Sequence, residues 1–251
     1  MLYSPITGTK NHIILERDTI NESADSISIG KNIYIIGGSG PIDLVYKFNI
    51  KAKALIKKSS MLVKKCFHSL CSANQLIFSI GGFDETNYLA DCEVYSTKDN
   101  KWSKLSNLIV ARGKSAVAVI NLIHVYTIGG RSDIQENINS IEKLKLKKFE
   151  NWSMVSMQNM IPPRRIMHSI QIGYNKVLVF GGYDGVMVYG DSYLMDVDEC
   201  VCVNGNKMKS CDSFMCVAAP VTDGQRVYAM SENRRIHIYC ILTGEWSEVH
   251  D

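Results

Sequence analysis

The 251-residue sequence lacks any hydrophobic run long enough to cross a membrane as a helix, because no window approaches the roughly 18 consecutive apolar residues that such a span needs. Its first residues show no basic flank followed by an apolar stretch, so we expect no secretory signal. The excess of positive charge is small, a formal +3, which by itself indicates neither a nucleic-acid nor a membrane partner. With 46% hydrophobic and 21% charged residues, we expect a folded, cytoplasmic and monomeric domain.

Cysteine is not scarce, since the chain has eight. Cys66, Cys71, Cys92 and Cys240 fall inside predicted strands, where cysteine commonly behaves as a small buried hydrophobe. Without a signal for secretion we interpret them as free thiols. Cys66, His68 and Cys71 are residue types that bind zinc, but they lack the paired spacing of a structural zinc site. We predict neither a metal nor a cofactor.

Four short apolar runs of this sequence each end in a Gly-Gly pair, and the pairs lie 44, 48 and 52 residues apart. A landmark that recurs at this period indicates an array of similar units. A glycine pair at the end of a strand permits a sharp turn or a close approach of another backbone, which a Cβ would obstruct. The runs with their pairs are 33–38, 76–82, 123–130 and 177–182.

Each glycine pair is surrounded by the same succession of short predicted strands. In the second unit these are 68–72, 76–80, 91–95 and 101–105, joined by turns rich in Asn, Asp, Ser and Thr. Four short strands joined by turns form one antiparallel sheet of a propeller. The sequence therefore predicts an all-β protein.

The landmarks resemble the kelch repeat, in which a glycine pair is followed by Tyr and then by Trp about seven positions later. The second unit matches best, with Gly81, Gly82, Tyr95 and Trp102. The other units keep part of the pattern: Gly129, Gly130, Leu144 and Trp152 in the third, Gly181 and Gly182 in the fourth, Phe48 and Leu55 in the first, and Tyr239 and Trp246 in the last. We expect the aromatic residues to pack between neighbouring blades.

We predict a single kelch-type β-propeller over residues 1–251, with five full four-stranded blades and an N-terminal hairpin remnant of a sixth. The first segment mirrors the last unit, because glycine follows Tyr3 by five positions as it follows Tyr239. We therefore expect residues 11–16 to form an outermost strand, in a fragment or truncated copy of a six-bladed protein. The predicted units are 1–20 for the partial blade and 21–63, 64–111, 112–163, 164–210 and 211–251 for the repeats.

Loops of a rigid scaffold carry function more often than its strands do. The loops after the glycine pairs and the basic residues before each first strand are expected to converge on one rim of the ring. Such a cationic rim suits an acidic segment of a protein partner, and we predict a non-catalytic protein-interaction module. The candidate binding residues are Lys65, Asp84, Glu85, Arg112, Arg131, Arg165, Tyr183 and Asp184.

Two alternatives remain open at this point. The lysine-rich runs 51–58 and 143–148 are typical of outer strands whose charges block edge pairing, but they could also form a basic docking patch. Copper-radical oxidases and sialic-acid epimerases use kelch-type propellers, so an enzyme acting on a sugar or another small molecule is the second interpretation. Neither family's residue set transfers position by position to this sequence, and we predict no catalytic residue.

Overall fold

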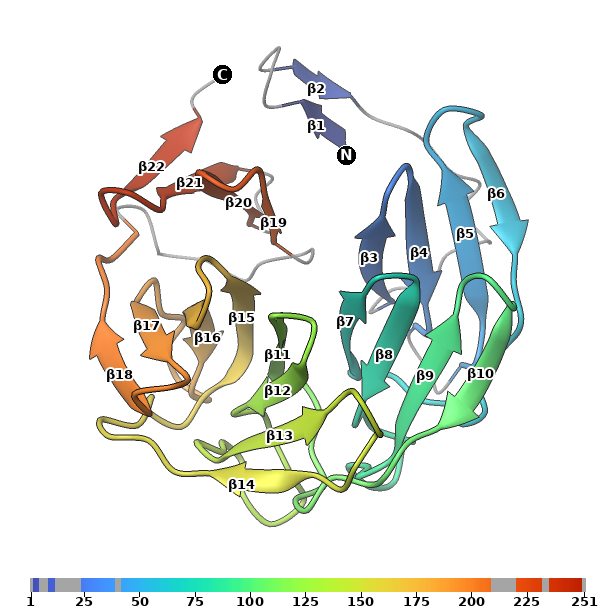
Figure 1. Cartoon of the computed structure of the whole chain (residues 1–251), viewed down its shortest axis with the longest axis horizontal. Coiled ribbons are helices and arrows are strands. Elements are labelled where there is room, and N and C mark those ends of the chain that lie inside the picture. The colour runs from blue at the N-terminus through green and yellow to red at the C-terminus, as the bar shows by residue number, and fades with distance from the viewer. Residues whose placement is uncertain are drawn as a thin grey trace.

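The computed structural model describes residues 2–4, 9–11, 24–38, 42–208, 220–231 and 235–249. Within these ranges every regular element is a strand, and no helix there is long and apolar enough to cross a membrane. Five four-stranded antiparallel sheets stand around a common axis as the blades of a propeller (Figure 1). The predicted fold, an all-β kelch-type propeller with five full blades, is confirmed.

Each blade follows the chain from its innermost to its outermost strand. Blade 1 has β3 (Asp25–Ile29), β4 (Asn32–Ile36), β5 (Val45–Asn49) and β6 (Ala54–Lys57). Blade 2 has β7 (Ser69–Ala73), β8 (Leu76–Ile80), β9 (Cys92–Ser96) and β10 (Lys101–Lys104). Blade 3 has β11 (Ala116–Ile120), β12 (His124–Ile128), β13 (Ile141–Lys145) and β14 (Ser153–Val155). Blade 4 has β15 (Arg165–Gln171), β16 (Lys176–Tyr183), β17 (Ser192–Asp196) and β18 (Val201–Asn204), and blade 5 has β19 (Val221–Thr222), β20 (Arg226–Met230), β21 (Ile236–Cys240) and β22 (Trp246–Val249).

A separate two-stranded sheet pairs β1 (Leu2–Ser4) with β2 (Thr9–Asn11). In Figure 1 it lies in the ring between blade 5 and blade 1, where a sixth blade would stand. The outermost strand was predicted for residues 11–16, but residues 12–16 lie outside the described residues. The observed outer strand β2 ends at Asn11.

The core lies between the blades because each strand buries the face that meets the next sheet. Tyr95 is fully buried, with its ring centroid 5.1 Å from that of Trp102 and 6.0 Å from that of Tyr34 in blade 1. Trp102 donates its indole N–H to the backbone oxygen of Ser59, at 2.9 Å. The aromatic pair of the repeat therefore joins blade 2 to blade 1, as the sequence predicts.

The glycine pairs mark places where two blades meet backbone to backbone. Gly81 has a φ of +60°, and a Cβ at this position would lie 2.1 Å from the backbone oxygen of Arg112 in the connection to blade 3. No side chain fits such a gap, and the left-handed conformation disfavours any residue with a Cβ. The pair thus fixes the distance between neighbouring blades.

The propeller has two faces, which we name by the loops they carry. The rim face holds the loops after β8, β12 and β16 and the connections from one blade to the next. The turn face holds the short turns between the first and second and between the third and fourth strands of each blade. This division follows from the antiparallel order of the strands in every blade.

Candidate functional site

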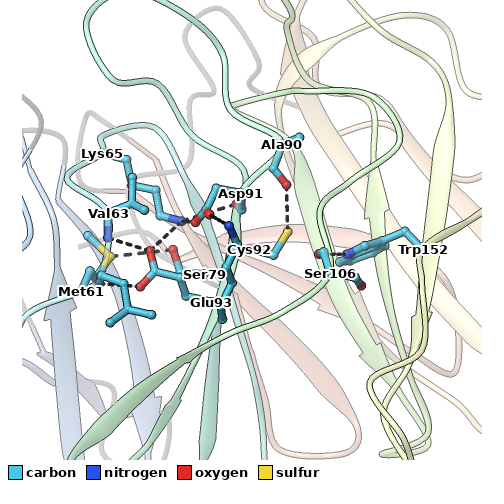
Figure 2. A network of polar contacts seen from close by, with 12 residues as sticks. Met61, Val63, Lys65, Ser79, Ala90, Asp91, Cys92, Glu93, Ser106 and Trp152 are labelled. Atoms are coloured by element: carbon cyan, nitrogen blue, oxygen red, sulfur yellow. Dashed lines mark hydrogen bonds and ion pairs between the residues drawn. The ribbon is translucent and has the colours of Figure 1, made fainter.

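Lys65 does not lie on the surface of the rim face, where the sequence-based prediction puts it. Its side chain is fully buried, and Nζ lies 3.2 Å from both the Asp91 and the Glu93 carboxylates (Figure 2). Glu93 also accepts hydrogen bonds from the backbone N–H groups of Leu62 and Val63, at 2.7 and 3.2 Å. Lys65 therefore anchors the connection between blades 1 and 2, and a partner cannot reach it.

Arg112 occupies the equivalent place between blades 2 and 3, and it too is fully buried. Its guanidinium donates to the Glu142 carboxylate at 2.7 Å and to the Ser140 hydroxyl at 2.8 Å. It also donates to the backbone oxygens of Val110, Gly129 and Ser140. The prediction that Lys65 and Arg112 bind a partner protein is therefore corrected. Both cations already pair with carboxylates inside the propeller.

The third member of this buried series is Arg164 rather than Arg165. Its guanidinium pairs with Asp191 at 2.8 Å and lies 3.6 Å from the ring centroid of Tyr189. Its backbone oxygen accepts the Gly130 N–H, as that of Arg112 accepts the Gly82 N–H. Arg165 is therefore one position further along and belongs to the rim.

Two residues beyond each buried cation, the backbone turns left-handed at the mouth of the ring. Phe67, Lys114 and Ile166 have φ values of 52°, 54° and 60°. Lys114 donates its N–H to the Phe67 oxygen, and Ile166 donates to the Lys114 oxygen, both at 2.8 Å. Such conformations are strained for residues with a Cβ, and this one is maintained by hydrogen bonds from blade to blade.

Lys114, Arg131 and Arg165, which we call the cationic rim, gather positive charge at this mouth. Lys114 Nζ lies 4.0 Å above the Phe67 ring. Burial lowers the pKa of Lys114, and the positive charges of Arg165 and Arg131 lower it further. The Arg131 guanidinium lies 5.9 Å from the ring centroid of Tyr88, and its Nε is buried without a hydrogen-bond partner.

The cationic rim contains one internal counter-charge. Arg165 donates to the Glu136 carboxylate and to the Asn137 side-chain oxygen, each at 3.1 Å, and lies over the Tyr183 ring. Its exposed fraction is only 7%, so its charge acts from below the surface. Among the described residues no carboxylate lies within 4.0 Å of Lys114 or Arg131. Within the described residues, Lys114 and Arg131 are therefore not neutralised by a direct ion pair.

The acidic loop residues mainly shape their own loops. Asp84 accepts the N–H groups of Thr86 and Asn87, and Asp184 accepts those of Val186 and Met187. The Met187 N–H, the Tyr189 hydroxyl and the Val186 N–H lower the pKa of Asp184 to about 2.

The two remaining predicted residues also lie in these loops. Tyr183 donates its hydroxyl to the Gly185 oxygen, at 2.7 Å. Glu85 is exposed and has a φ of 82°.

Contacts between the loops join them into one surface. The Tyr88 N–H donates to the Asp133 carboxylate at 3.0 Å, which links the loops of blades 2 and 3. The Asn137 side chain donates to the backbone oxygen of Asp184, which links the loops of blades 3 and 4. Of the three basic residues expected to converge with these loops, Arg165 does so through Glu136 and Asn137, whereas Lys65 and Arg112 are buried.

Sequence reasoning missed Lys114, the most central of the three cations. A signal was present, because Lys114 follows Arg112 by two positions in the same connection. The repeat pattern favours the cation that recurs before each first strand. The structure shows that this recurring cation is the buried one.

The cysteines of the described residues are free, and Cys66, Cys71, Cys92 and Cys202 are buried. Burial raises the pKa of the Cys92 and Cys71 thiols, which favours the protonated, unreactive form. Within the part of the chain that the structure describes, no group of three or more His, Cys, Asp or Glu could hold a metal ion.

Asp25 in β3 of blade 1 and His68 just before β7 of blade 2 also have strongly shifted pKa values. Burial raises the pKa of Asp25 to about 6, while the backbone N–H groups of Ser26 and Leu70 and the charge of His168 oppose the shift. Burial against Gly37 lowers the pKa of His68 to about 3, and the positive charge of Lys65 lowers it further. Interblade packing therefore accounts for both shifts.

Comparison of the sequence with known proteins shows which family the chain belongs to. The model described as the KLHDC2/KLHL20/DRC7 Kelch-repeats domain matches residues 16–182, more than half of the chain. The chain is 31% identical over 155 residues to Kelch repeat and BTB domain-containing protein 2 of Horsepox virus, which covers 61% of this chain and 27% of that protein. It is 24% identical over 237 residues to Kelch-like protein 38 of Homo sapiens, which covers 90% of this chain and 39% of that protein. The chain thus spans less than half the length of these relatives.

Proposed function

Because the chain belongs to the kelch-repeat family, whose members are generally protein-interaction or substrate-adaptor modules, we propose that it binds a partner protein through the rim face. The bound element is an acidic segment that lies across the loops of blades 2, 3 and 4. The observation that carries this proposal is the cationic rim, in which Arg165 pairs with Glu136 while Lys114 and Arg131 form no ion pair with a described residue.

The three cations have different parts in this binding. Lys114 and Arg131 are partly exposed and have no carboxylate partner among the described residues, so they pair with carboxylates of the segment. Arg165 strengthens the positive potential from beneath, and its pairing with Glu136 holds the loop 131–137 in place. Phe67 and Tyr88 supply the apolar surface beneath the two accessible cations.

A short fluorescein-labelled peptide in which Glu alternates with Ser tests this proposal by fluorescence anisotropy. We expect binding that weakens as salt is added, because the pairs are exposed to solvent. Each exposed pair contributes up to about 1 kcal/mol, so Lys114→Gln combined with Arg131→Gln should weaken binding about five- to thirtyfold.

The matched control is Lys176→Gln, an exposed lysine at the start of β16 on the turn face. It removes the same charge and should leave the affinity within about twofold, because the site lies on the opposite face. The proposal fails if a peptide with Gln in place of Glu binds as tightly as the Glu peptide. It also fails if Lys176→Gln weakens binding as much as the double variant of the rim does.

No observation on the described residues favours the enzyme interpretation over binding. It requires titratable groups that converge in a cavity with perturbed pKa values. The shifted pKa values of Asp25 and His68 arise chiefly from burial between blades, and the Leu70 N–H of the next blade, which donates to Asp25 at 3.0 Å, stabilises the charged form of Asp25.

A further inference from the structure

A cluster of exposed apolar side chains lies on the turn face, opposite the cationic rim. Leu122, Ile123 and Phe149 of blade 3 are 55%, 43% and 40% exposed, and Tyr174 of blade 4 is 75% exposed. We call these four residues the turn-face patch. They occupy three turns of two adjacent blades, β11–β14 and β15–β18 in Figure 1.

Hydrogen bonds hold the three turns side by side. The Leu146 N–H donates to the Ile123 backbone oxygen at 2.8 Å, which joins the two turns of blade 3. The Asn121 side chain donates to that of Asn175 at 3.0 Å and accepts from Gln171 at 2.7 Å, which joins blade 3 to blade 4. The three turns that carry the patch are therefore fixed relative to one another.

The residue types of the patch are unfavourable for the fold itself. Leu122 and Phe149 have φ values of 57° and 47°. At the turn that corresponds to Leu122, blades 1 and 2 use Gly30 and Asn74, which tolerate this conformation. At the turn that corresponds to Phe149, the other blades use Lys53, Asn100, Cys200 and Gly244, so Phe149 is the large apolar residue of that set. Phe149 gains part of its packing from the Phe78 ring of blade 2, 6.4 Å away between centroids, but both Leu122 and Phe149 keep large apolar surface in a strained turn. Strain retained in this way accompanies binding surfaces.

Lysines border the patch on the blade 3 side. Lys145, Lys147 and Lys148 are exposed and Lys143 is partly exposed. None of the four pairs with a carboxylate among the described residues. The charges of Lys143 and Lys145 contribute to the lowered pKa of His124, after the burial of that ring. The lysine-rich run of the sequence thus adjoins the apolar patch.

We propose that the turn-face patch is a second docking surface, which receives an amphipathic helical segment of a protein partner. The apolar stripe of the helix covers Leu122, Ile123, Phe149 and Tyr174, and acidic residues along one edge of the helix pair with the lysines of β13 and the following turn. The occupant is a helix with one acidic edge because its negative charge complements the unpaired lysine run. The site is separate from the cationic rim and does not depend on it.

A helix fits this surface better than an extended strand does. Strand addition needs free backbone groups at a sheet edge. Here the turn backbone is used internally, since Ile123 donates its N–H to Ile120 and accepts from Leu146. Side chains at i, i+4 and i+7 of a helix present a compact apolar group of the same kind as the patch.

An anionic membrane is the other chemistry that pairs lysines with apolar side chains. Glu150, Asp198 and Glu199 are exposed in the turns of blades 3 and 4 that surround the patch. A negatively charged bilayer would be repelled by these carboxylates. A helix with one acidic edge places its charge over the lysines only.

Two displayed libraries of helical peptides test this proposal. Both carry an apolar stripe at i, i+4 and i+7, and one has an acidic flank while the other has a basic flank. The protein variant is Leu122→Asn with Phe149→Asn, because asparagine tolerates left-handed backbone and the fold should remain intact. Leu242→Asn, on a leucine of blade 5 that lies on the same face and is more exposed than Leu122, is the control.

We expect clones from the acidic library to bind the wild-type chain, and the double variant to weaken them at least about tenfold. Leu242→Asn should leave their affinity within about twofold, as should Lys114→Gln with Arg131→Gln on the rim face. The proposal is overturned if neither library yields clones, if the basic library yields them, or if the double variant binds the clones unchanged. Binding to phosphatidylserine vesicles without selection of peptides, or self-association lost in the double variant, also overturns it.

Discussion

Replacing Arg112 by methionine should unfold the propeller at a markedly lower temperature without a direct effect on binding. The guanidinium makes five hydrogen bonds and has no exposed surface. Methionine keeps an unbranched apolar side chain but leaves the Glu142 carboxylate buried without its cation. Removing one partner of a buried ion pair costs about 3–5 kcal/mol.

This free energy translates into a large shift of the melting temperature. For a chain of this size, 1 kcal/mol corresponds to about 2–4 °C, so we expect Tm to fall by about 6–20 °C. Circular dichroism melts at neutral pH measure this fall, and urea unfolding measures the free energy itself. Arg112→Lys should lose less, because Lys65 pairs with Glu93 at the equivalent place in blade 2.

The control for Arg112→Met is Arg131→Met on the rim. Arg131 is partly exposed and pairs with no described carboxylate, so its replacement should change the stability by less than about 1 kcal/mol. A melt of Arg112→Met within about 2 °C of wild type would refute the reasoning. If that variant also lost the acidic peptide, Arg112 would be a binding residue after all.

Three further predictions test other parts of the structure. Gly81→Ala should destabilise the fold by at least about 1–3 kcal/mol, whereas Gly30→Ala, with open space around it, should cost about 1 kcal/mol in parallel thermal melts. Asp25 has a raised folded-state pKa of about 6 against 3.8, so wild-type stability should fall as pH rises from about 4 to about 6. Asp25→Asn should remove that slope in urea titrations and gain up to about 3 kcal/mol at pH 7. Glu136→Gln should strengthen binding of the acidic peptide by about two- to fivefold in anisotropy titrations, because it removes the internal competitor for Arg165.

The architecture could be predicted from the sequence because its landmarks depend on local chemistry. A glycine pair such as Gly81 and Gly82 is required wherever the backbone of the next blade passes within contact distance. Tyr95 and Trp102 recur because each blade must present large apolar surface to its neighbour. Both requirements repeat with every blade, so they leave a period in the sequence.

The burial of Lys65 and Arg112 could not be predicted in the same way. Their counter-charges, Glu93 and Glu142, lie 28 and 30 positions further along, inside strands where a carboxylate gives no sign of being buried. A recurring cation is compatible with a repeated surface or with a repeated ion pair. Only the three-dimensional register distinguishes the two, and here it favours the ion pair.

Which arginine of the adjacent pair Arg164 and Arg165 is buried also depends on the register. The second glycine of each pair follows Arg112 and Arg164 by 18 positions, so this count favours Arg164 in the fourth unit. In the second unit the same count gives Lys64, whereas the buried lysine is Lys65, so the count alone does not decide between neighbouring cations. The backbone bond from Gly130 to Arg164 settles the register.

The ion pairs between the blades also explain why the rim is positive although the chain carries little net charge. Arg112 and Arg164 each face a carboxylate, so these buried pairs add almost no field at the surface. Lys114 and Arg131 come from the same connections and loops, yet no described carboxylate neutralises them. Their potential therefore extends into solvent over about one Debye length, roughly 8–10 Å, which is far enough to attract an acidic segment before contact. Shortening that length with salt should slow association with the acidic peptide more than it speeds dissociation, since screened attraction acts mainly on the encounter.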